Sequence, residues 1–276
     1  MPDQYAVIGN PIRQSKSPLI HTQFAKDTEQ ELTYVALEGP LGGFAAAVDT
    51  FRAGGGRGLN VTAPFKLDAC AYATVLSPRA QLAGAVNCLK FEGDVVRADN
   101  YDGIGLVNDI ERNLGCVLAG KRVLLLGAGG AARGALLSLL EAQPATLVIA
   151  NRTAHTAHAL AQPLKSHAQL SSCGLSDLSG ERFDVVLNGT SASLFGECPA
   201  IPPTVFDAQT IAYEMVYGKG LTPFLRLAQG AGAAKLADGV GMLVQQAVEA
   251  FAWWRGVRPS ETTARALIAQ LTVPLV

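Results

Sequence analysis

A short apolar run, followed by a glycine-rich turn, a helix and a second apolar run, constrains the fold of this chain more than any other feature. Residues 122–126 read Arg-Val-Leu-Leu-Leu, and residues 127–132 read Gly-Ala-Gly-Gly-Ala-Ala. Residues 133–140 have a helical pattern, and residues 146–150 form the next apolar run. This order predicts a Rossmann-type βαβ unit, in which glycines allow a tight turn and let a pyrophosphate approach the N-terminus of the helix.

The residues at the end of the second strand predict which dinucleotide such a unit would bind. An NAD site usually carries an acidic residue there, which binds the ribose 2′-hydroxyl. This chain has Asn151-Arg152-Thr153 instead, and a guanidinium pairs with a 2′-phosphate that a carboxylate would repel. We therefore predict NADP as the cofactor; the alternatives are a site for another nucleotide and a purely structural glycine turn. The cofactor-binding residues predicted in this stretch are Gly127, Ala128, Gly129, Gly130, Ala131, Asn151, Arg152 and Thr153.

The residues before this unit alternate between strand and helix patterns, which favours a largely parallel sheet with helices on both faces. Strands are predicted at 5–8, 32–37, 58–61 and 85–91, and helices at 18–27, 43–52 and 66–74. Further predicted elements are a helix at 102–113, strands at 183–188 and 211–215, and helices at 241–256 and 261–271. We expect the two C-terminal helices to pack back on the first domain.

These patterns together predict an α/β fold with two domains. Residues 1–102 form a substrate-binding and catalytic domain, which the C-terminal helices within 240–276 complete. Residues 103–239 form the Rossmann domain, and the two domains flank a cleft.

Composition excludes several classes of protein. The net charge of -1 argues against a nucleic-acid or acidic-membrane binder, and no apolar run reaches the roughly 18 residues that a membrane span needs. The N-terminus lacks a basic segment of the secretory type, and the five cysteines are scattered, so we expect a cytoplasmic protein with reduced thiols. His155 and His158 have no third ligand nearby, so no metal site is predicted.

Four segments of the first domain are polar where plain loops would be expected. They are residues 10–18, 60–66, 84–87 and 99–103, and the first two lie at the ends of predicted strands. The carboxyl ends of strands line the ligand crevice of an open α/β sheet. Taken singly, Ser15 and Ser17 suit helix caps, Asn60 a turn and Asp102 an N-cap. Together the segments offer hydroxyls, amides, one amine and one carboxylate, which suit a small polyhydroxylated substrate.

The chain resembles the shikimate dehydrogenase family in motifs that follow one another from residue 5 to about residue 256. They are Asn10-Pro with Ser15-Lys-Ser-Pro18, Asn60-Val-Thr-x-Pro-Phe-Lys66, Gly84-Ala-Val-Asn87, Asp99-Asn-x-Asp-Gly103, Gly127-Ala-Gly-Gly-Ala131, Asn151-Arg-Thr153, Asn188-Gly-Thr-Ser191, Tyr217 with Lys219-Gly-x-Thr-Pro223, and Asp238-Gly-x-Gly-Met-Leu-Val-x-Gln-Ala247.

The resemblance implies NADP-dependent reduction of 3-dehydroshikimate to shikimate in aromatic amino-acid biosynthesis. It implies that Lys66 and Asp102 form the catalytic pair and that Ser15 and Ser17 hold the substrate carboxylate. The remaining substrate-binding residues implied are Asn60, Thr62, Asn87, Tyr217 and Gln246, and the nicotinamide would lie near Thr190, Met215 and Gly239. The partners implied are a small-molecule substrate and, at most, a second copy of the chain, as a monomer or homodimer.

Two positions depart from the family pattern. Tyr101 stands where the family has threonine or serine, and Thr156 stands where a second arginine often follows the Asn-Arg-Thr motif. The tyrosine ring would fill part of the substrate pocket, bind the substrate carboxylate through its hydroxyl, or point away from the cleft into the domain hinge. The absence of a second arginine predicts a moderate preference for NADP over NAD.

Two other functions remain open on the sequence alone. One is a related enzyme acting on quinate or another cyclohexane polyol, with NAD as an alternative cofactor. The other is a weakly catalytic relative that binds a metabolite, against which the retention of both Lys66 and Asp102 argues.

Overall fold

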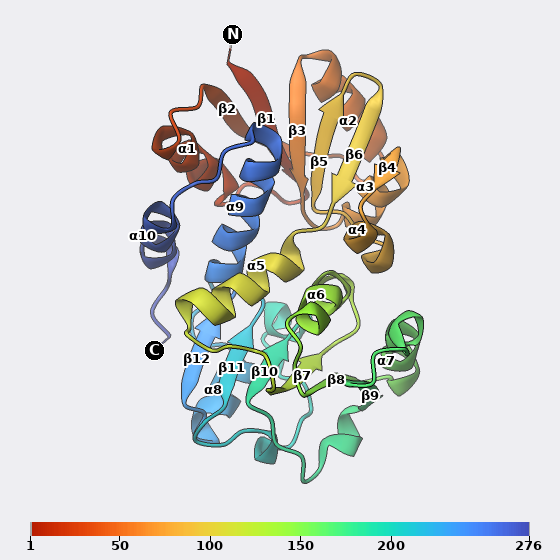
Figure 1. The fold of residues 1–276 in the computed structure, drawn as a ribbon, viewed down its shortest axis with the longest axis vertical. Coiled ribbons are helices and arrows are strands. Elements are labelled where there is room, and N and C mark those ends of the chain that lie inside the picture. The colour runs from red at the N-terminus through yellow and green to blue at the C-terminus, as the bar shows by residue number, and fades with distance from the viewer. Residues whose placement is uncertain (1, 276) are drawn as a thin grey trace. The chain divides into compact units, whose positions relative to one another are not determined.

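The computed structural model describes residues 2–275, which divide into two compact α/β units. The first unit comprises the residues up to Gly105 together with Val244–Leu267, and the second comprises Leu106–Leu243 with the residues from Ile268 onward. The predicted α/β class with two units is confirmed (Figure 1).

The first unit contains a six-stranded sheet of order β2-β1-β3-β5-β6-β4. Its strands are β1 (Asp3–Gly9), β2 (Leu32–Glu38), β3 (Gly56–Val61), β4 (Val75–Leu76), β5 (Cys88–Glu92) and β6 (Val95–Asp99). The helices are α1 (Ser17–Asp27), α2 (Phe44–Ala53), α3 (Lys66–Tyr72), α4 (Pro78–Ala83) and most of two C-terminal helices, α9 (Val240–Arg255) and α10 (Glu261–Leu271), which enter the unit at Val244 and leave it after Leu267. The sheet is parallel except for β5, which runs antiparallel to both β3 and β6. One strand was predicted at 85–91. The structure has a hairpin instead, in which β5 begins at Cys88 and β6 follows it after a short turn.

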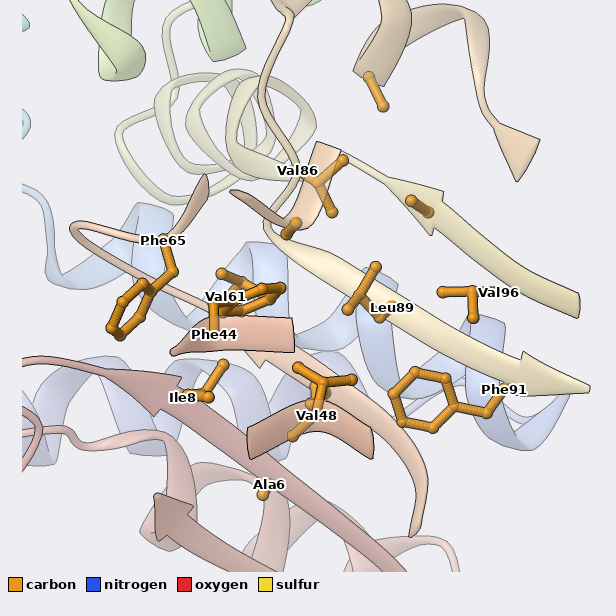
Figure 2. Packing of buried hydrophobic residues seen from close by; sticks show 14 residues of the cluster. Ala6, Ile8, Phe44, Val48, Val61, Phe65, Val86, Leu89, Phe91 and Val96 are labelled. Carbon is orange, nitrogen blue, oxygen red and sulfur yellow. The ribbon is translucent and has the colours of Figure 1, made fainter. Parts of the chain in front are cut away.

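Alternation along β1 divides the core of the first unit between the two faces of this sheet. Ala6 and Ile8 pack with Phe44 and Val48 of α2 on one face, where they are fully or almost fully buried (Figure 2). Tyr5 and Val7 point to the other face, where they pack with Ala250 and Trp254 of α9. Because successive strand residues face opposite sides, a strand buried on both faces needs this unbroken apolar run. The C-terminal helix α9 therefore completes the core of the first unit.

The second unit contains a fully parallel six-stranded sheet of order β12-β11-β10-β7-β8-β9. Its strands are β7 (Arg122–Leu126), β8 (Thr146–Asn151), β9 (Leu170–Gly174), β10 (Val185–Asn188), β11 (Ile211–Glu214) and β12 (Lys235–Asp238), and its helices are α6 (Gly130–Glu141), α7 (Ala154–Ala161) and α8 (Pro223–Gly230). Single 3-10 turns lie at Gln162–Leu164, Leu175–Leu178, Ala192–Phe195 and Pro203–Val205. The chain winds to one side from β7 and to the other from β10, and ligands of such sheets bind where neighbouring strands diverge in this way.

The predicted helix at 102–113 is two elements. Helix α5 (Asp102–Asn108) passes into a π-helical turn at Asp109–Asn113. The buried Asp109 carboxylate accepts hydrogen bonds from the Tyr213 hydroxyl at 2.6 Å and from Asn113 Nδ2 at 2.8 Å. A Cβ on Gly241, in the first turn of α9, would overlap the same carboxylate. The end of α5 and the start of α9 are thus packed against each other with no room for a side chain between them.

Candidate functional site

Lys66 and Asp102 form an ion pair in the first unit. Lys66 is the first residue of α3, and Asp102 is the first residue of α5. Lys66 Nζ lies 2.5 Å from Asp102 Oδ2, and the exposed fractions of the two side chains are 26% and 9%. The Asp102 side chain is therefore almost enclosed, while about a quarter of the Lys66 side chain remains exposed. The structure brings the two predicted catalytic residues together.

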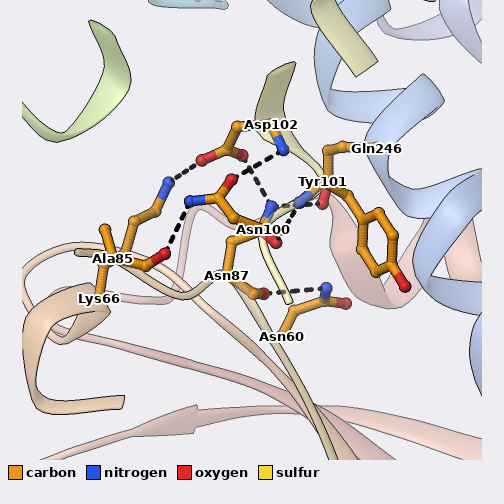
Figure 3. Close-up of polar contacts among 8 residues, drawn as sticks. All are labelled: Asn60, Lys66, Ala85, Asn87, Asn100, Tyr101, Asp102 and Gln246. Carbon is orange, nitrogen blue, oxygen red and sulfur yellow. Dashed lines mark hydrogen bonds and ion pairs between the residues drawn. The ribbon is translucent and has the colours of Figure 1, made fainter. Parts of the chain in front are cut away.

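Asn87 connects Asp102 to the C-terminal helix. Its Nδ2 donates to Asp102 Oδ1 at 2.8 Å and to Gln246 Oε1 of α9 at 3.3 Å, while its Oδ1 accepts from the backbone N–H of Tyr101 at 2.9 Å (Figure 3). Both of its N–H groups therefore have protein partners, so Asn87 organises the catalytic pair and has only a lone pair left to offer a ligand.

A residue that the sequence reasoning gave no role, Asn100, fixes the start of α5. Its Oδ1 accepts from the backbone N–H of Asp102 at 3.1 Å, and its Nδ2 donates to the Ala85 carbonyl at 3.0 Å (Figure 3). The preceding Asp99 accepts from Ser77 Oγ at 2.5 Å and from Arg79 at 2.7 Å. The signal was present in the Asp-Asn-x-Asp-Gly motif, since asparagine is a preferred residue in front of a helix.

The other predicted substrate-binding residues of the first unit lie on or beside α1 and β3. Asn60 is buried in β3, where its Nδ2 donates to the Asn87 carbonyl at 3.3 Å and its Oδ1 accepts from the Tyr34 hydroxyl at 2.7 Å. Ser15 Oγ accepts from the backbone N–H of Ser17, which is buried at the start of α1, at 3.3 Å. Thr62 follows β3, and its backbone N–H donates to Ile8 at 3.0 Å. The N-cap position of α1 belongs to Lys16, which makes no side-chain capping hydrogen bond, so Ser17 lies inside the helix and the Ser15 hydroxyl accepts its N–H from just outside.

Tyr101 does not reach the catalytic pair. Its side chain is 5% exposed and points away from Lys66 and Asp102 (Figure 3). The ring packs edge-on against Trp253 of α9 at 5.9 Å, and the Arg79 guanidinium lies 5.5 Å from its centre. Of the three orientations expected from the sequence, the side chain has the one directed away, and it is packed inside the first unit rather than in a hinge. Burial raises the pKa of its hydroxyl, which stays protonated.

The glycine turn of the second unit leaves space in front of α6. Gly127 has φ +100°, a conformation in which other residues are strained, and a Cβ there would press on Thr190 and Gly189. A Cβ on Gly129 or Gly130 would meet no atom within 4 Å. The space beside these two glycines, at the start of a 12-residue helix that no side chain caps, fits the pyrophosphate of a dinucleotide.

The residues predicted to select the cofactor lie at the carboxyl end of β8. Asn151 Nδ2 donates to the Thr153 carbonyl at 3.1 Å, which shapes the turn into α7. Arg152 is exposed and forms no hydrogen bond or ion pair with any residue between 2 and 275. Thr156 lies in the first turn of α7 and adds no positive charge. A single guanidinium with its donors available fits one 2′-phosphate.

Thr190, Met215 and Gly239 follow the carboxyl ends of three neighbouring strands, β10, β11 and β12. A Cβ on Gly239 would overlap the Met215 backbone, and one on Gly189 would lie 3.1 Å from the Met215 sulfur. The three predicted nicotinamide residues are thus grouped at one edge of the sheet, where close backbone packing requires glycine.

A buried glutamate that the sequence reasoning missed supports this edge. Glu214 has no exposed surface, and its Oε2 accepts from Asn188 at 3.0 Å, Ser193 at 2.5 Å and Thr222 at 3.0 Å. Asn188 Oδ1 in turn accepts from the Thr190 hydroxyl at 2.7 Å. Burial raises the pKa of Glu214, and the hydrogen bonds oppose that rise. A charged residue in a short apolar strand gives little sign in the sequence that it is enclosed.

Tyr217 belongs to the second unit, where it follows β11 and is partly buried, and burial raises its pKa. Within residues 2–275 no group of three or more His, Cys, Asp or Glu side chains is placed to hold a metal ion. None of the helices in the described part of the chain is long and apolar enough to cross a membrane.

Three family models match consecutive parts of the chain. Residues 7–89 match the shikimate dehydrogenase substrate binding domain, residues 109–195 match shikimate/quinate 5-dehydrogenase, and residues 239–268 match the shikimate 5′-dehydrogenase C-terminal domain. A curated relative from Aromatoleum aromaticum, named shikimate dehydrogenase (NADP(+)), is 56% identical over 97% of this chain and 96% of its own length.

Solved structures agree over nearly the whole chain. The crystal structure of an Ael1 enzyme from Pseudomonas putida is 57% identical, with a TM-score of 0.95 over 99% of this chain and 100% of that one. A shikimate 5-dehydrogenase from Thermus thermophilus, solved in complex with NADP(H) and shikimate, is 29% identical, with a TM-score of 0.85 over 98% of this chain and 99% of that one.

Proposed function

Because the chain belongs to the shikimate dehydrogenase family, we propose that it catalyses the NADP-dependent, reversible reduction of 3-dehydroshikimate to shikimate by hydride transfer, a step in aromatic amino-acid biosynthesis. The observation that carries this proposal is the ion pair of Lys66 and Asp102, in which the Lys66 side chain is partly exposed and Asn87 holds the carboxylate. A protein that only bound a metabolite would have no need of this pair.

The chemistry of the chain's own residues follows from that geometry. NADPH, when bound, supplies the hydride that reduces the substrate ketone. The alkoxide that develops on the substrate oxygen needs a proton, and Lys66 Nζ is the donor that we assign to it. Asp102 holds the amine by accepting one of its three N–H bonds, which leaves two for the substrate oxygen. In the oxidative direction the same amine accepts the proton.

The substrate contacts follow the family pattern at the positions of this chain. Ser15 and Ser17 hold the carboxylate, and Asn60 and Thr62 bind ring hydroxyls from β3. Asn87 and Gln246 complete this group through their shared hydrogen bond. Tyr217 is the one proposed substrate contact that comes from the second unit.

The second unit holds the cofactor in this proposal. The open space at Gly129 and Gly130 takes the pyrophosphate, with Gly127, Ala128 and Ala131 forming the rest of the turn. Asn151, Arg152 and Thr153 bind the 2′-phosphate end, and Thr190, Met215 and Gly239 border the nicotinamide.

The domain roles and the setting complete the proposal. Residues 1–102 with the helices of 240–276 form the substrate-binding domain, and residues 103–239 form the NADP-binding domain. The enzyme acts in the cytoplasm as a monomer or homodimer, which sedimentation of the purified protein distinguishes.

Steady-state kinetics with two substrates and two cofactors test this function. The native enzyme is assayed in the oxidative direction with shikimate and with quinate, each with NADP and with NAD. We expect the highest kcat/KM with shikimate and NADP. A higher value for quinate would make the chain a quinate dehydrogenase, and no turnover in any combination would favour a metabolite-binding protein.

A further inference from the structure

Tyr34 of β2 lies next to two residues that the proposed function assigns to the substrate. It pairs with Tyr5 in the sheet register, while Asn60 pairs with Val7 of the same strand, so Tyr34 and Asn60 flank β1. The Tyr34 hydroxyl reaches over β1 and donates to Asn60 Oδ1 at 2.7 Å. The Ser17 side chain interacts with the same hydroxyl. One buried phenol thus lies between the residues proposed for the carboxylate and for a ring hydroxyl.

The surroundings of Tyr34 allow its ring little freedom. The tyrosine is 7% exposed, and its ring stacks on the His21 ring with centroids 4.2 Å apart and planes 3° from parallel. His21 is buried, and burial lowers its pKa to about 3, an effect that a weaker interaction with the Asn60 side chain opposes. It therefore stays neutral and contributes an aromatic face. Burial also raises the pKa of Tyr34 well above its usual value, so the hydroxyl remains a donor.

Two hydrogen bonds determine whether the Asn60 side chain offers its amide oxygen or its amide nitrogen to a ligand. The Asn87 carbonyl can only accept, so it pairs with Nδ2, and Tyr34 supplies the donor that Oδ1 then requires. With Oδ1 occupied by the Tyr34 hydroxyl, the end of the amide that donates is Nδ2, and only one of its two N–H groups is used by the Asn87 carbonyl. The side chain is set to donate a hydrogen bond to a substrate oxygen.

We propose that Tyr34 is a positioning residue for substrate binding: its hydroxyl holds the Asn60 amide so that Asn60 presents an N–H to a substrate hydroxyl oxygen. The inference rests on the proposed function, because it takes Asn60 as a substrate contact. Tyr34 itself does not touch the reacting atoms.

The first test removes only the hydroxyl. Tyr34→Phe is expected to raise KM for shikimate about two- to tenfold, the range for one lost neutral hydrogen bond, with kcat and the KM for NADP unchanged. Tyr72→Phe is the matched control, because that hydroxyl also makes hydrogen bonds in the first unit, to Asp49 at 2.5 Å and with Arg52 at 2.9 Å. An unchanged KM in Tyr34→Phe, or an equal rise in Tyr72→Phe, overturns the proposal.

A double-mutant cycle shows whether Tyr34 acts through Asn60. If it does, Tyr34→Phe with Asn60→Ala has the same shikimate KM as Asn60→Ala alone, because the residue that the hydroxyl positions is already gone. Multiplied effects of the two changes would mean that Tyr34 acts independently, and would overturn the proposal. An unchanged shikimate KM in Asn60→Ala alone would instead remove the proposed substrate contact on which the inference stands.

Two further variants keep the test decisive if Tyr34→Phe folds poorly. Asn60→Asp can still accept from Tyr34 but has no N–H to offer, so KM for shikimate should rise at least as far as in Asn60→Ala. His21→Phe keeps an aromatic face against Tyr34 and should leave that KM within about twofold of the native value, since the hydroxyl remains. A fully active Asn60→Asp, or a His21→Phe as impaired in shikimate KM as Asn60→Ala, would contradict the proposed role.

Discussion

The two units each contain a polar network around one carboxylate, and the networks differ in what they leave accessible. In the first unit Asp102 is held by Asn87, while its other partner, Lys66, keeps about a quarter of its side chain exposed. In the second unit three side chains converge on Glu214, which has no exposed surface. The first network presents a proton donor to a ligand, and the second holds a loop in place. The same hydrogen-bonding groups therefore serve chemistry or support, according to which member reaches the surface.

The largest expected effect comes from removing the Lys66 amine. Lys66→Met should lower kcat about 10²- to 10⁴-fold, the range for a positioned acid–base group, with a much smaller change in shikimate KM. Initial rates in both directions measure it. Lys90→Met is the control, because Lys90 pairs with the exposed Glu92 at 3.2 Å and should keep the native rate. An unchanged kcat in Lys66→Met would remove Lys66 from the mechanism.

The matching change in the second network should cost stability first. In Glu214→Gln one carboxylate oxygen becomes an N–H₂ group, which cannot accept the hydrogen bonds that donors make to that oxygen. At least one of these donors is then left without its acceptor. We expect the free energy of unfolding to fall by about 1–3 kcal/mol and the KM for NADP to rise as the Thr190 loop shifts. Urea denaturation measures the first effect.

Glu181→Gln provides the comparison for Glu214→Gln. Glu181 is half-exposed and pairs with Arg122 at the surface, so its exchange should change stability by less than about 0.5 kcal/mol. Equal losses in the two variants would show that enclosure of Glu214 has no special role.

Arg152 lies outside both networks, and its removal should act on cofactor choice alone. Arg152→Ala should raise the KM for NADP roughly tenfold, because one charge-assisted contact with the 2′-phosphate is lost, and leave the KM for NAD nearly unchanged. Kinetics with both cofactors at saturating shikimate measure this ratio. If both KM values rise equally, Arg152 supports the turn into α7 and does not discriminate between cofactors.

The smallest expected effect is an opposite response of the two units to acid. The Arg255 hydrogen bond lowers the pKa of Asp3 in the first unit, and bonds from Ser260 and Thr263 lower that of Asp27 against the effect of burial. A lowered pKa stabilises the fold above the unfolded value, near 3.8, and that contribution is lost as the pH falls through the folded pKa. In the second unit burial raises the pKa of Asp109, Glu214 and Asp238, so their contribution is present in acid and is lost as the pH rises through the folded values.

The two tryptophans make this difference measurable, because Trp253 and Trp254 both belong to the first unit. Below about pH 4 the free energy of unfolding, measured by urea denaturation followed by tryptophan fluorescence, should fall by less than about 1 kcal/mol, since Asp3 is partly exposed. Hydrogen exchange of the β10 and β11 amides should hold or slow over the same range. Asp3→Asn should remove part of the fluorescence change, and parallel losses in both units would contradict the comparison.

Local sequence patterns predicted the second unit well. Its strand, glycine turn and helix follow one another in the sequence and also contact one another in the fold, so a short window contains the information. The helix predicted from residue 133 starts at Gly130, because the small residues of the turn are already helical. In the first unit the β5–β6 hairpin was missed, as the charged residues around Gly93 gave no clear alternation. The strand direction there depends on pairings between distant residues, which a periodic pattern does not contain.

The candidate site was predictable as residue types and less so as contacts. Lys66, Asn87 and Gln246 are far apart in the chain, and only the return of α9 to the first unit brings the last of them to the others. The side-chain direction of Tyr101 was open because a residue between a strand and a helix can turn either way. Packing against Trp253 fixes the direction of the Tyr101 side chain. Because Trp253 is about 150 residues further along the sequence, the residues around Tyr101 do not reveal this contact.

The contact between Asp109 and Gly241 restricts the order in which substitutions at these two positions can accumulate during evolution. Any residue other than glycine at 241 would collide with a carboxylate that Tyr213 and Asn113 already hold in place. A lineage could gain a side chain at 241 only after Asp109 had been replaced by something smaller, and that first step would leave the Tyr213 hydroxyl without its acceptor. Asp109, Tyr213 and Gly241 are therefore expected to change together, and a substitution at one of them that a relative with different residues at the other two tolerates should destabilise this chain when it is made alone.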